Sequence, residues 1–157
     1  MGVTREEFRR WLGSFAAGVT VVTTRSPAGM PYGLTVTAFT SVSLDPPLVL
    51  VCVDKKSESH PHFLASRVFA VNFLAAEQEE LSRRFAVSGG DKFQGVTFSF
   101  GRTGAPLLAG ALGFVESEVE QEVDAGDHTI FIGRVVAGHC VDDKRPLLYF
   151  RGRYYSV

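Results

Sequence analysis

The stretch from Gly33 to Val53, GLTVTAFTSVSLDPPLVLVCV, decides the fold of this 157-residue chain. Its first part belongs to a predicted strand from Tyr32 to Phe39, rich in β-branched residues. Asp45-Pro46-Pro47 then interrupts strand pairing, because proline has no backbone N–H to donate to a sheet. Leu48 to Val53 follows as a continuous apolar run, which predicts a strand buried on both faces. The stretch therefore favours a β-rich fold.

Strand-like segments continue on both sides of this stretch, with few helices between them. Two helices are predicted, at residues 61–66 and 76–86, and the second has acidic residues in its first turn and arginines in its last. Further strands are predicted at residues 19–24, 68–73, 111–123, 128–140 and 147–150. Since strands and helices do not alternate regularly, the pattern indicates a mainly β, antiparallel barrel with a few short helices.

The N-terminal segment predicts a helix with a defined start. Thr4 and Glu7 have the spacing of a capping box, in which each side chain accepts a hydrogen bond from the other residue's backbone. The helix is expected to end at Gly18. Its apolar face is formed by four residues spaced three and four apart: Phe8, Trp11, Leu12 and Phe15.

Composition limits the possible classes of function. No repeat or linker divides residues 1–157, so one domain is expected. Sixteen Lys and Arg against seventeen Asp and Glu give a net charge of -1, which does not favour nucleic-acid binding. No apolar run is long enough to span a membrane, and the first residues do not resemble a secretion signal. A cytoplasmic protein is the expectation.

Several common catalytic motifs are missing from the sequence. It contains no G-x-G-x-x-G, no P-loop, no G-x-S-x-G and no H-E-x-x-H. The two cysteines, Cys52 and Cys140, have no metal-ligand spacing and are expected to be buried, reduced thiols. His60 and His62 are not expected to bind a metal, and no metal site is predicted. His128, which follows a Gly-Asp turn and begins a strand, is the histidine with the clearest functional potential.

A row of glutamates is the most prominent charge pattern. Glu116, Glu118, Glu120 and Glu122 alternate along one predicted strand, where residues two apart lie about 6.5–7 Å from each other on the same face. No histidine accompanies them. The pattern favours four like charges on a strand that faces solvent or an interface.

Two neighbouring segments carry groups suited to ligand binding. From Gly33 to Ser43, five of eleven residues bear hydroxyls, and a polar strand running into a Ser/Thr loop can hydrogen-bond a planar heterocycle. Lys55 to His60 adds two lysines, two serines and a predicted helix start, which together can hold a phosphate.

The same stretch, GLTVTAFTSVSLDPPLVLVCV, resembles the short-chain flavin reductases, the reductase components of two-component flavin monooxygenases. Four further segments resemble this family in the same order: VNFLAAEQEELSRRFA, DKFQGV, GDHTIFIGRV and RPLLYFRGRYY. The resemblance implies a flavin-binding split β-barrel of Greek-key type. It also implies a homodimer, reduction of FMN or FAD by NADH or NADPH, and delivery of reduced flavin to a partner monooxygenase.

The resemblance also assigns roles to individual residues. Flavin-ring contacts would fall on Thr37, Ala38, Phe39, Thr40, Ser41 and Ser43. Phosphate contacts would fall on Lys55, Ser57, Glu58, Ser59 and His60, with Lys92 and Phe93 at a further edge of the flavin. The nicotinamide side would include His128, Tyr149, Phe150, Arg151 and Gly152.

The chemistry implied by the resemblance needs little from the protein itself. Hydride passes directly from the nicotinamide to the flavin, so no catalytic acid, base or nucleophile is expected, with His128 as an auxiliary group at most. The absence of an obvious arginine cluster favours NADH over NADPH. Three alternatives stay open: an FMN-binding electron carrier, a protein of the pyridoxamine-phosphate oxidase type, and a non-enzymatic interaction module.

Overall fold

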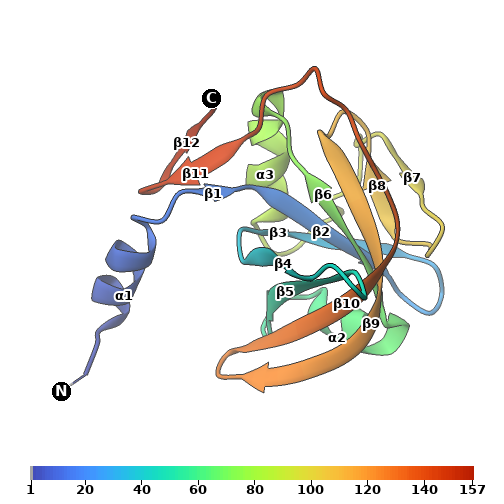
Figure 1. The fold of residues 1–157 in the computed structure, drawn as a ribbon, viewed down its shortest axis with the longest axis horizontal. Coiled ribbons are helices and arrows are strands. Elements are labelled where there is room, and N and C mark those ends of the chain that lie inside the picture. Colours follow the sequence, from blue (N-terminus) through green and yellow to red (C-terminus); the bar gives the residue numbers. More distant parts are fainter. Residues whose placement is uncertain (1) are drawn as a thin grey trace.

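The structure is a computed structural model that describes residues 2–157 and consists mainly of antiparallel strands (Figure 1). Its helices are α1 (Arg5–Leu12), α2 (His60–Ser66), the short 3₁₀ helix η1 (Ala76–Gln78) and α3 (Glu79–Phe85). Its strands are β1 (Ala17–Gly18), β2 (Thr20–Arg25), β3 (Pro31–Val36), β4 (Phe39–Ser43), β5 (Leu48–Asp54), β6 (Val68–Phe73), β7 (Phe98–Phe100), β8 (Pro106–Leu108), β9 (Gly113–Ala125), β10 (His128–Cys140), β11 (Leu148–Phe150) and β12 (Arg153–Tyr155). The predicted mainly β, antiparallel class is confirmed.

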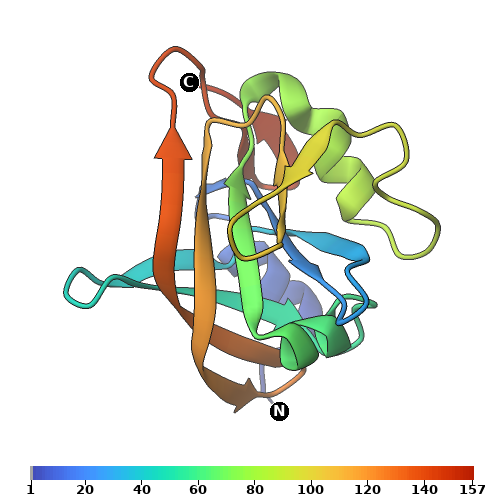
Figure 2. The ribbon, with the colours of Figure 1, turned by 90° about the vertical axis from the view of Figure 1, so that its right-hand side faces the viewer.

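A seven-stranded sheet with the order β3-β2-β6-β9-β10-β5-β4 forms the barrel (Figure 2). The two edge strands, β3 and β4, are consecutive in the chain and are joined only by Thr37 and Ala38. The sheet therefore curls until its edges meet at this two-residue connection. Its interior is filled by valines and phenylalanines, among them the fully buried Phe63, Phe69 and Phe131.

The stretch from Gly33 to Val53 differs from expectation in two respects. The strand predicted to continue to Phe39 ends at Val36, and the Ser/Thr-rich segment that follows forms β4 rather than a loop. In β5, Val49, Val51 and Val53 are buried while the residues between them are half-buried. The prediction of a strand buried on both faces is therefore wrong, because only the face with Val49, Val51 and Val53 packs into the barrel core.

Helix α1 has the predicted capping box but a shorter length. The Glu7 amide donates to Thr4 Oγ1 (3.1 Å), and the Thr4 amide donates to Glu7 Oε1 (3.3 Å). The helix ends at Leu12, before Gly18, because Ala17 and Gly18 pair with β11 instead. The helix projects from the barrel (Figure 1). None of its residues is buried, and its apolar side chains are exposed.

The glutamate row does not form a uniformly solvent-facing stripe. Glu116 is only 2% exposed. Its carboxylate accepts hydrogen bonds from the Arg102 amide (3.0 Å), the Thr103 amide (2.8 Å) and Thr103 Oγ1 (2.6 Å). Gly101 completes this turn, since a Cβ there would overlap the carboxylate of Glu116. The prediction of solvent or interface exposure is wrong for Glu116 because this turn folds over it.

The outer glutamates lie on the surface, as expected of their charge. The β9–β10 pairing has two register shifts, and the one at Glu120 inserts an extra residue into β9, which breaks the strict alternation along the row. Glu120 pairs with Arg134 Nε (2.7 Å), and Glu122 lies 3.8 Å from Arg67. The cysteines also depart from expectation, since Cys140 is exposed and Cys52 is half-buried.

Candidate functional site

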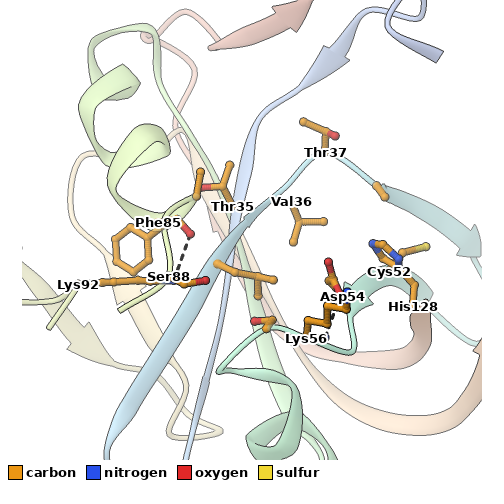
Figure 3. Close-up of a pocket in the computed structure, with 14 residues that line it drawn as sticks. Thr35, Val36, Thr37, Cys52, Asp54, Lys56, Phe85, Ser88, Lys92 and His128 are labelled. Carbon is orange, nitrogen blue, oxygen red and sulfur yellow. Dashed lines mark hydrogen bonds between the residues drawn. The ribbon is translucent and has the colours of Figure 1, made fainter. Parts of the chain in front are cut away.

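A cleft of about 370 Å³ opens where β3 and β5 separate, and α3 with its following loop forms its other side (Figure 3). β3 runs through the middle of the site. Phe85, Ser88 and Lys92 lie on one side of it, and Cys52, Asp54 and His128 lie on the other. The cleft is lined by Leu34, Thr35, Val36, Thr37, Ala38, Cys52, Asp54, Lys56, Ser57, Phe85, Ala86, Ser88, Lys92 and His128.

Strand pairing explains why the sheet opens at this place. The first part of β5 pairs with β4, from Leu48 to Val51. The Cys52 amide then donates to the Ala38 carbonyl (3.1 Å), at the corner between β3 and β4. Beyond this bond the chain of β3 leads away, so the last residues of β5 have no strand partner on that side. The cleft occupies the resulting split in the barrel.

Five of the residues assigned from the resemblance come together in this cleft. Thr37 and Ala38 form its corner, Ser57 follows β5, Lys92 lies in the loop after α3, and His128 begins β10. These residues come from four separate parts of the chain. Their convergence on one cleft supports a single binding site, and their individual roles remain predictions.

The remaining assigned residues of β4 lie outside the cleft in this chain. Thr40 and Ser41 are exposed on the edge strand, and Ser43 is half-buried. Phe39 packs against Phe73, with ring centroids 5.5 Å apart, and borders a separate apolar groove. Contacts from these residues to a ligand in the cleft would need the ligand to extend past Ala38 along β4.

The segment from Lys55 to His60 is divided between several environments. Lys55 pairs with Asp124 and donates to the Gly126 carbonyl (2.8 Å), so it ties β5 to the β9–β10 turn. Its neighbour Lys56, the second lysine of the predicted phosphate segment, lines the cleft instead. His60 Nε2 lies 2.8 Å from Thr129 Oγ1.

Ser59 and Glu58 lie beside the cleft rather than in it. Ser59 is buried and donates from its hydroxyl to the Gly33 carbonyl (3.3 Å). Both residues border a narrow pocket of about 60 Å³ on the far side of Lys92. Lys92 lines both hollows and is therefore the link between them.

Lys92 is held by backbone groups on both of its sides. Its ammonium donates to the carbonyls of Gly33 (3.3 Å) and Phe85 (3.3 Å). Partial burial lowers the pKa of Lys92, and the negative charge of Glu58 opposes this shift. The neighbouring Phe93 is buried in a second core, where its ring meets Phe85 edge-on at 5.0 Å. Lys92 thus fixes the loop after α3 against β3.

His128 is oriented by the residue before it. Its Nδ1 lies 2.7 Å from Asp127 Oδ1, and this hydrogen bond lowers the pKa of Asp127. A carboxylate at Nδ1 favours the tautomer with a proton on that nitrogen, which leaves Nε2 free to accept a hydrogen bond. His128 also lies opposite Asp54 in the β10–β5 register, at the mouth of the cleft.

The four residues assigned to the nicotinamide side besides His128 lie elsewhere on the molecule. Tyr149 and Phe150 are on β11, and Arg151 and Gly152 form the turn to β12. This hairpin lies against the end of α1, where the Arg151 amide donates to the Gly13 carbonyl (2.9 Å). In this chain the structure does not bring them to the cleft.

Nine of the fourteen cleft residues were not assigned a role from the resemblance, and three of them come from one short segment. Cys52, Asp54 and Lys56 follow one another at the end of β5 at intervals of two, which places Cys52 and Asp54 on one face of the strand. The alternation of Cys52 and Asp54 with valines is visible in the sequence. Because the residues from Leu48 to Val53 are all apolar, however, the sequence does not show that one face of the strand lines a cleft. Partial burial raises the pKa of the Cys52 thiol.

Metal chemistry has no obvious ligand set in the described part of the chain. Across residues 2–157, no group of three or more His, Cys, Asp or Glu side chains is arranged to hold a metal ion. His62, one of the two histidines considered above, stacks on Tyr32 with ring centroids 3.7 Å apart.

Comparison with known proteins gives consistent matches over nearly the whole chain. The chain is 39% identical over 150 residues to the reductase subunit HsaB of a flavin-dependent monooxygenase from Rhodococcus jostii, covering 96% of this chain and 76% of that protein. It is 41% identical over 155 residues to an NADH-dependent FAD reductase of Streptomyces globisporus, covering 96% of this chain and 84% of the relative. It spans only 46% of a longer relative, a probable flavin reductase of Rhizobium meliloti.

Solved structures also match this chain over nearly its whole length. The Streptomyces globisporus NADH:FAD oxidoreductase SgcE6, in complex with NAD and FAD fragments, superposes with a TM-score of 0.91 at 41% identity, covering 96% of this chain and 91% of that one. The structure of the flavin reductase PheA2 gives a TM-score of 0.89 at 39% identity, covering 99% of this chain and 99% of that one. The family model for the flavin reductase like domain matches residues 12–157. The chain belongs to the family of flavin reductase like domains.

Proposed function

We propose that this protein is an NAD(P)H-dependent flavin reductase that supplies reduced FMN or FAD to a partner monooxygenase. The observation that carries the proposal is the cleft at the split of the barrel, where family-assigned residues from four parts of the chain converge. Relatives named as NADH-dependent FAD reductase, FMN reductase (NADH) and monooxygenase reductase components support the reaction. They favour NADH as the reductant.

The cleft has the residues needed to hold a flavin. Apolar side chains of Leu34, Val36 and Phe85 suit the flat ring, and Thr37 and Ser57 provide hydroxyls at the rim. Lys56 and Lys92 provide cations on two different segments for a phosphate group. When bound, the flavin supplies the redox chemistry by accepting a hydride at its ring. The protein holds the ring in place and leaves one side open to the second substrate.

His128 is the residue best placed to guide the nicotinamide. Because its Nδ1 faces Asp127, its Nε2 can accept a hydrogen bond from a carboxamide N–H at the cleft mouth. This contact would orient the nicotinamide over the flavin without transferring a proton. An open cleft also suits release of the reduced flavin to another protein.

The decisive experiment measures oxidation of NADH and NADPH with FMN, with FAD and without added flavin. A flavin reductase gives steady turnover that requires free flavin. Tight FMN binding without NAD(P)H oxidation would indicate an electron carrier instead. Oxidation of a pyridoxamine phosphate would indicate the related oxidase class, and a colourless protein that ignores all of these would indicate an interaction module.

Thr37→Ala is expected to weaken flavin binding without unfolding the protein. Thr37 forms the corner of the cleft and is exposed, so it supports no core contact. Loss of one hydrogen bond should cost about 0.5–1.5 kcal/mol, or a few-fold to about tenfold in affinity. Fluorescence titration with FMN and FAD measures this. Ser41→Ala tests the β4 assignment in the same assay, and unchanged affinity in both variants would contradict the placement of the ring.

The assembly is proposed to be a homodimer. The apolar face of α1 is largely exposed, with Phe8 at 57% and Trp11 at 53%. Phe15, which follows the helix, is 76% exposed, and Leu44 at the tip of the β4–β5 hairpin is 93% exposed. Such unpaired apolar surface favours burial against a second subunit. Sedimentation equilibrium should give a mass near twice 17.1 kDa. Phe15→Ser should shift the protein toward monomer, and a wild-type monomer with full activity at micromolar concentration would contradict the proposal.

Location in the cytoplasm is part of the same proposal, because reduced nicotinamide cofactors and partner oxygenases are available there. Among the helices formed by residues 2–157, none combines the length and apolar character needed to cross a membrane.

A further inference from the structure

The loop that follows α3 forms part of the cleft wall and has little else to hold it. We refer to residues Ser88–Asp91 as the glycine loop, after its two central residues. Ser88 lines the cleft, and all four residues are exposed. Within residues 2–157, no backbone hydrogen bond involves Ser88, Gly89 or Gly90. Exposure without backbone hydrogen bonds is typical of a segment that can move at low cost.

The two glycines give this loop its hinges. Gly89 and Gly90 both have positive φ, at 89° and 71°, in the region that favours glycine. A Cβ added at either position would meet no heavy atom within 4 Å, so the loop is not packed against its neighbours. Large changes of backbone angle are therefore open to these two residues.

The chain on both sides of the glycine loop is fixed. Phe85 before the loop and Phe93 after it are buried, and their rings meet edge-on with centroids 5.0 Å apart. The Arg84 guanidinium also donates to the Gln94 carbonyl (2.7 Å), which ties the end of α3 to the segment beyond the loop. Movement is thus confined to the few residues between these anchors.

Lys92 is a cation at the base of the glycine loop, beside Phe85 and Ser88 (Figure 3). Its ammonium lies between the carbonyls of Gly33 and Phe85, 3.3 Å from each. Among the ion pairs formed by residues 2–157, none involves Lys92. Hydrogen bonds from an ammonium to an anion are usually shorter, at about 2.7–2.9 Å, and stronger than bonds to a neutral acceptor. A phosphate in the cleft can therefore compete with the two carbonyls for this ammonium.

We propose that the glycine loop is a lid, which Lys92 closes by exchanging the two carbonyls for the phosphate of a bound flavin. This inference rests on the proposed function, because it needs a flavin in the cleft. It makes Lys92 a determinant of specificity. FMN and FAD carry phosphate and close the lid, whereas riboflavin has the same ring and leaves it open.

The exchange also explains how the lid can reopen. Ordering the loop costs conformational entropy, which the new charge-assisted hydrogen bond offsets. The carbonyls of Gly33 and Phe85 stay available as the alternative partners of the ammonium. Lys92 therefore has two defined positions, one for each state of the lid, and the reduced flavin can leave when the ammonium returns to the carbonyls.

Hydrogen–deuterium exchange of the loop amides, followed by mass spectrometry, tests the lid on the wild-type protein. Saturating FMN should slow exchange across Ser88–Asp91 about tenfold or more, and saturating riboflavin should leave it within about twofold. In fluorescence titration, FMN should bind about tenfold more tightly than riboflavin. This comparison uses no variant, so it does not depend on how a variant folds.

Variants assign the closure to Lys92. In Lys92→Gln, saturating FMN should no longer protect the loop, while Lys92→Arg keeps the cation and should keep the protection. Lys56→Gln is the matched comparison, since Lys56 lines the cleft but follows β5. It should weaken FMN binding and leave the loop protected once FMN is saturating. Lys144→Gln, which removes a lysine bonded to the Gly110 carbonyl away from the cleft, should change neither quantity. A thermal melt checks that each variant is folded.

Three results would overturn the lid: equal protection by FMN and riboflavin, unprotected exchange in the FMN-saturated protein, or protection that survives in Lys92→Gln. Flavin-dependent NADH oxidation on the same preparations separates this inference from the proposed function. Turnover without loop protection removes only the lid. Failure of any flavin to bind removes both.

Discussion

Replacing Glu116 by alanine is expected to lower the free energy of unfolding by about 2–4 kcal/mol. The carboxylate is buried and accepts three hydrogen bonds from the turn that contains Arg102 and Thr103. Its removal leaves two backbone amides and one hydroxyl without their acceptor, and it also leaves a void beneath the turn. Both effects act against the folded state.

Urea denaturation followed by circular dichroism measures this loss. The midpoint should fall while the slope with urea stays the same, because the unfolded surface is unchanged. Glu118→Ala is the matched control, since Glu118 is exposed on the same strand and its removal should change stability by less than about 0.5 kcal/mol. Equal stability in the two variants would show that the Glu116 carboxylate is not part of the folded core.

His128→Ala is expected to reduce kcat/KM for NADH about tenfold to a hundredfold, equivalent to about 1–3 kcal/mol. The imidazole lines the cleft mouth and is oriented by Asp127, so the alanine variant loses both the contact and its direction. Flavin affinity should change much less. Stopped-flow and steady-state kinetics give the NADH parameters, and fluorescence titration gives the flavin affinity.

A thermal melt of the same preparation separates this role from a structural one. If His128 only supports the β9–β10 turn, the variant will lose thermal stability and keep its kinetic constants per folded molecule. His139→Ala is a suitable control, because His139 lies on the same strand, is exposed and does not line the cleft. Loss of thermal stability in His128→Ala with unchanged kinetic constants would remove His128 from the site.

Much of the architecture follows from local sequence signals. The strand at 68–73 was predicted with its observed bounds, and the capping box of Thr4 and Glu7 forms as expected. These features depend on neighbours in the chain, which a sequence pattern records directly. The last strand was predicted at 147–150 and forms as β11. The short strands β1, β7 and β8 were not predicted, because three residues or fewer leave little measurable period.

The misplaced predictions share a different cause. Period-two alternation put Glu116 on a solvent-facing row, but its burial depends on a turn from another part of the chain. In the same way, the apolar run of β5 concealed that Cys52 and Asp54 face a cleft. Sequence patterns report the face of a strand on which a residue lies, and long-range packing decides what covers that face.

The two edges of the seven-stranded sheet are protected unequally, which bears on solubility. The Gly33 carbonyl on β3 is capped by the Lys92 ammonium and the Ser59 hydroxyl, so this edge offers little to a foreign strand. Among residues 2–157, no strand pairs with the outer edge of β4, and its hairpin ends in the exposed Leu44. An open edge beside apolar side chains is a template for aggregation. Overproduced chains should therefore aggregate first through β4, before the barrel itself unfolds.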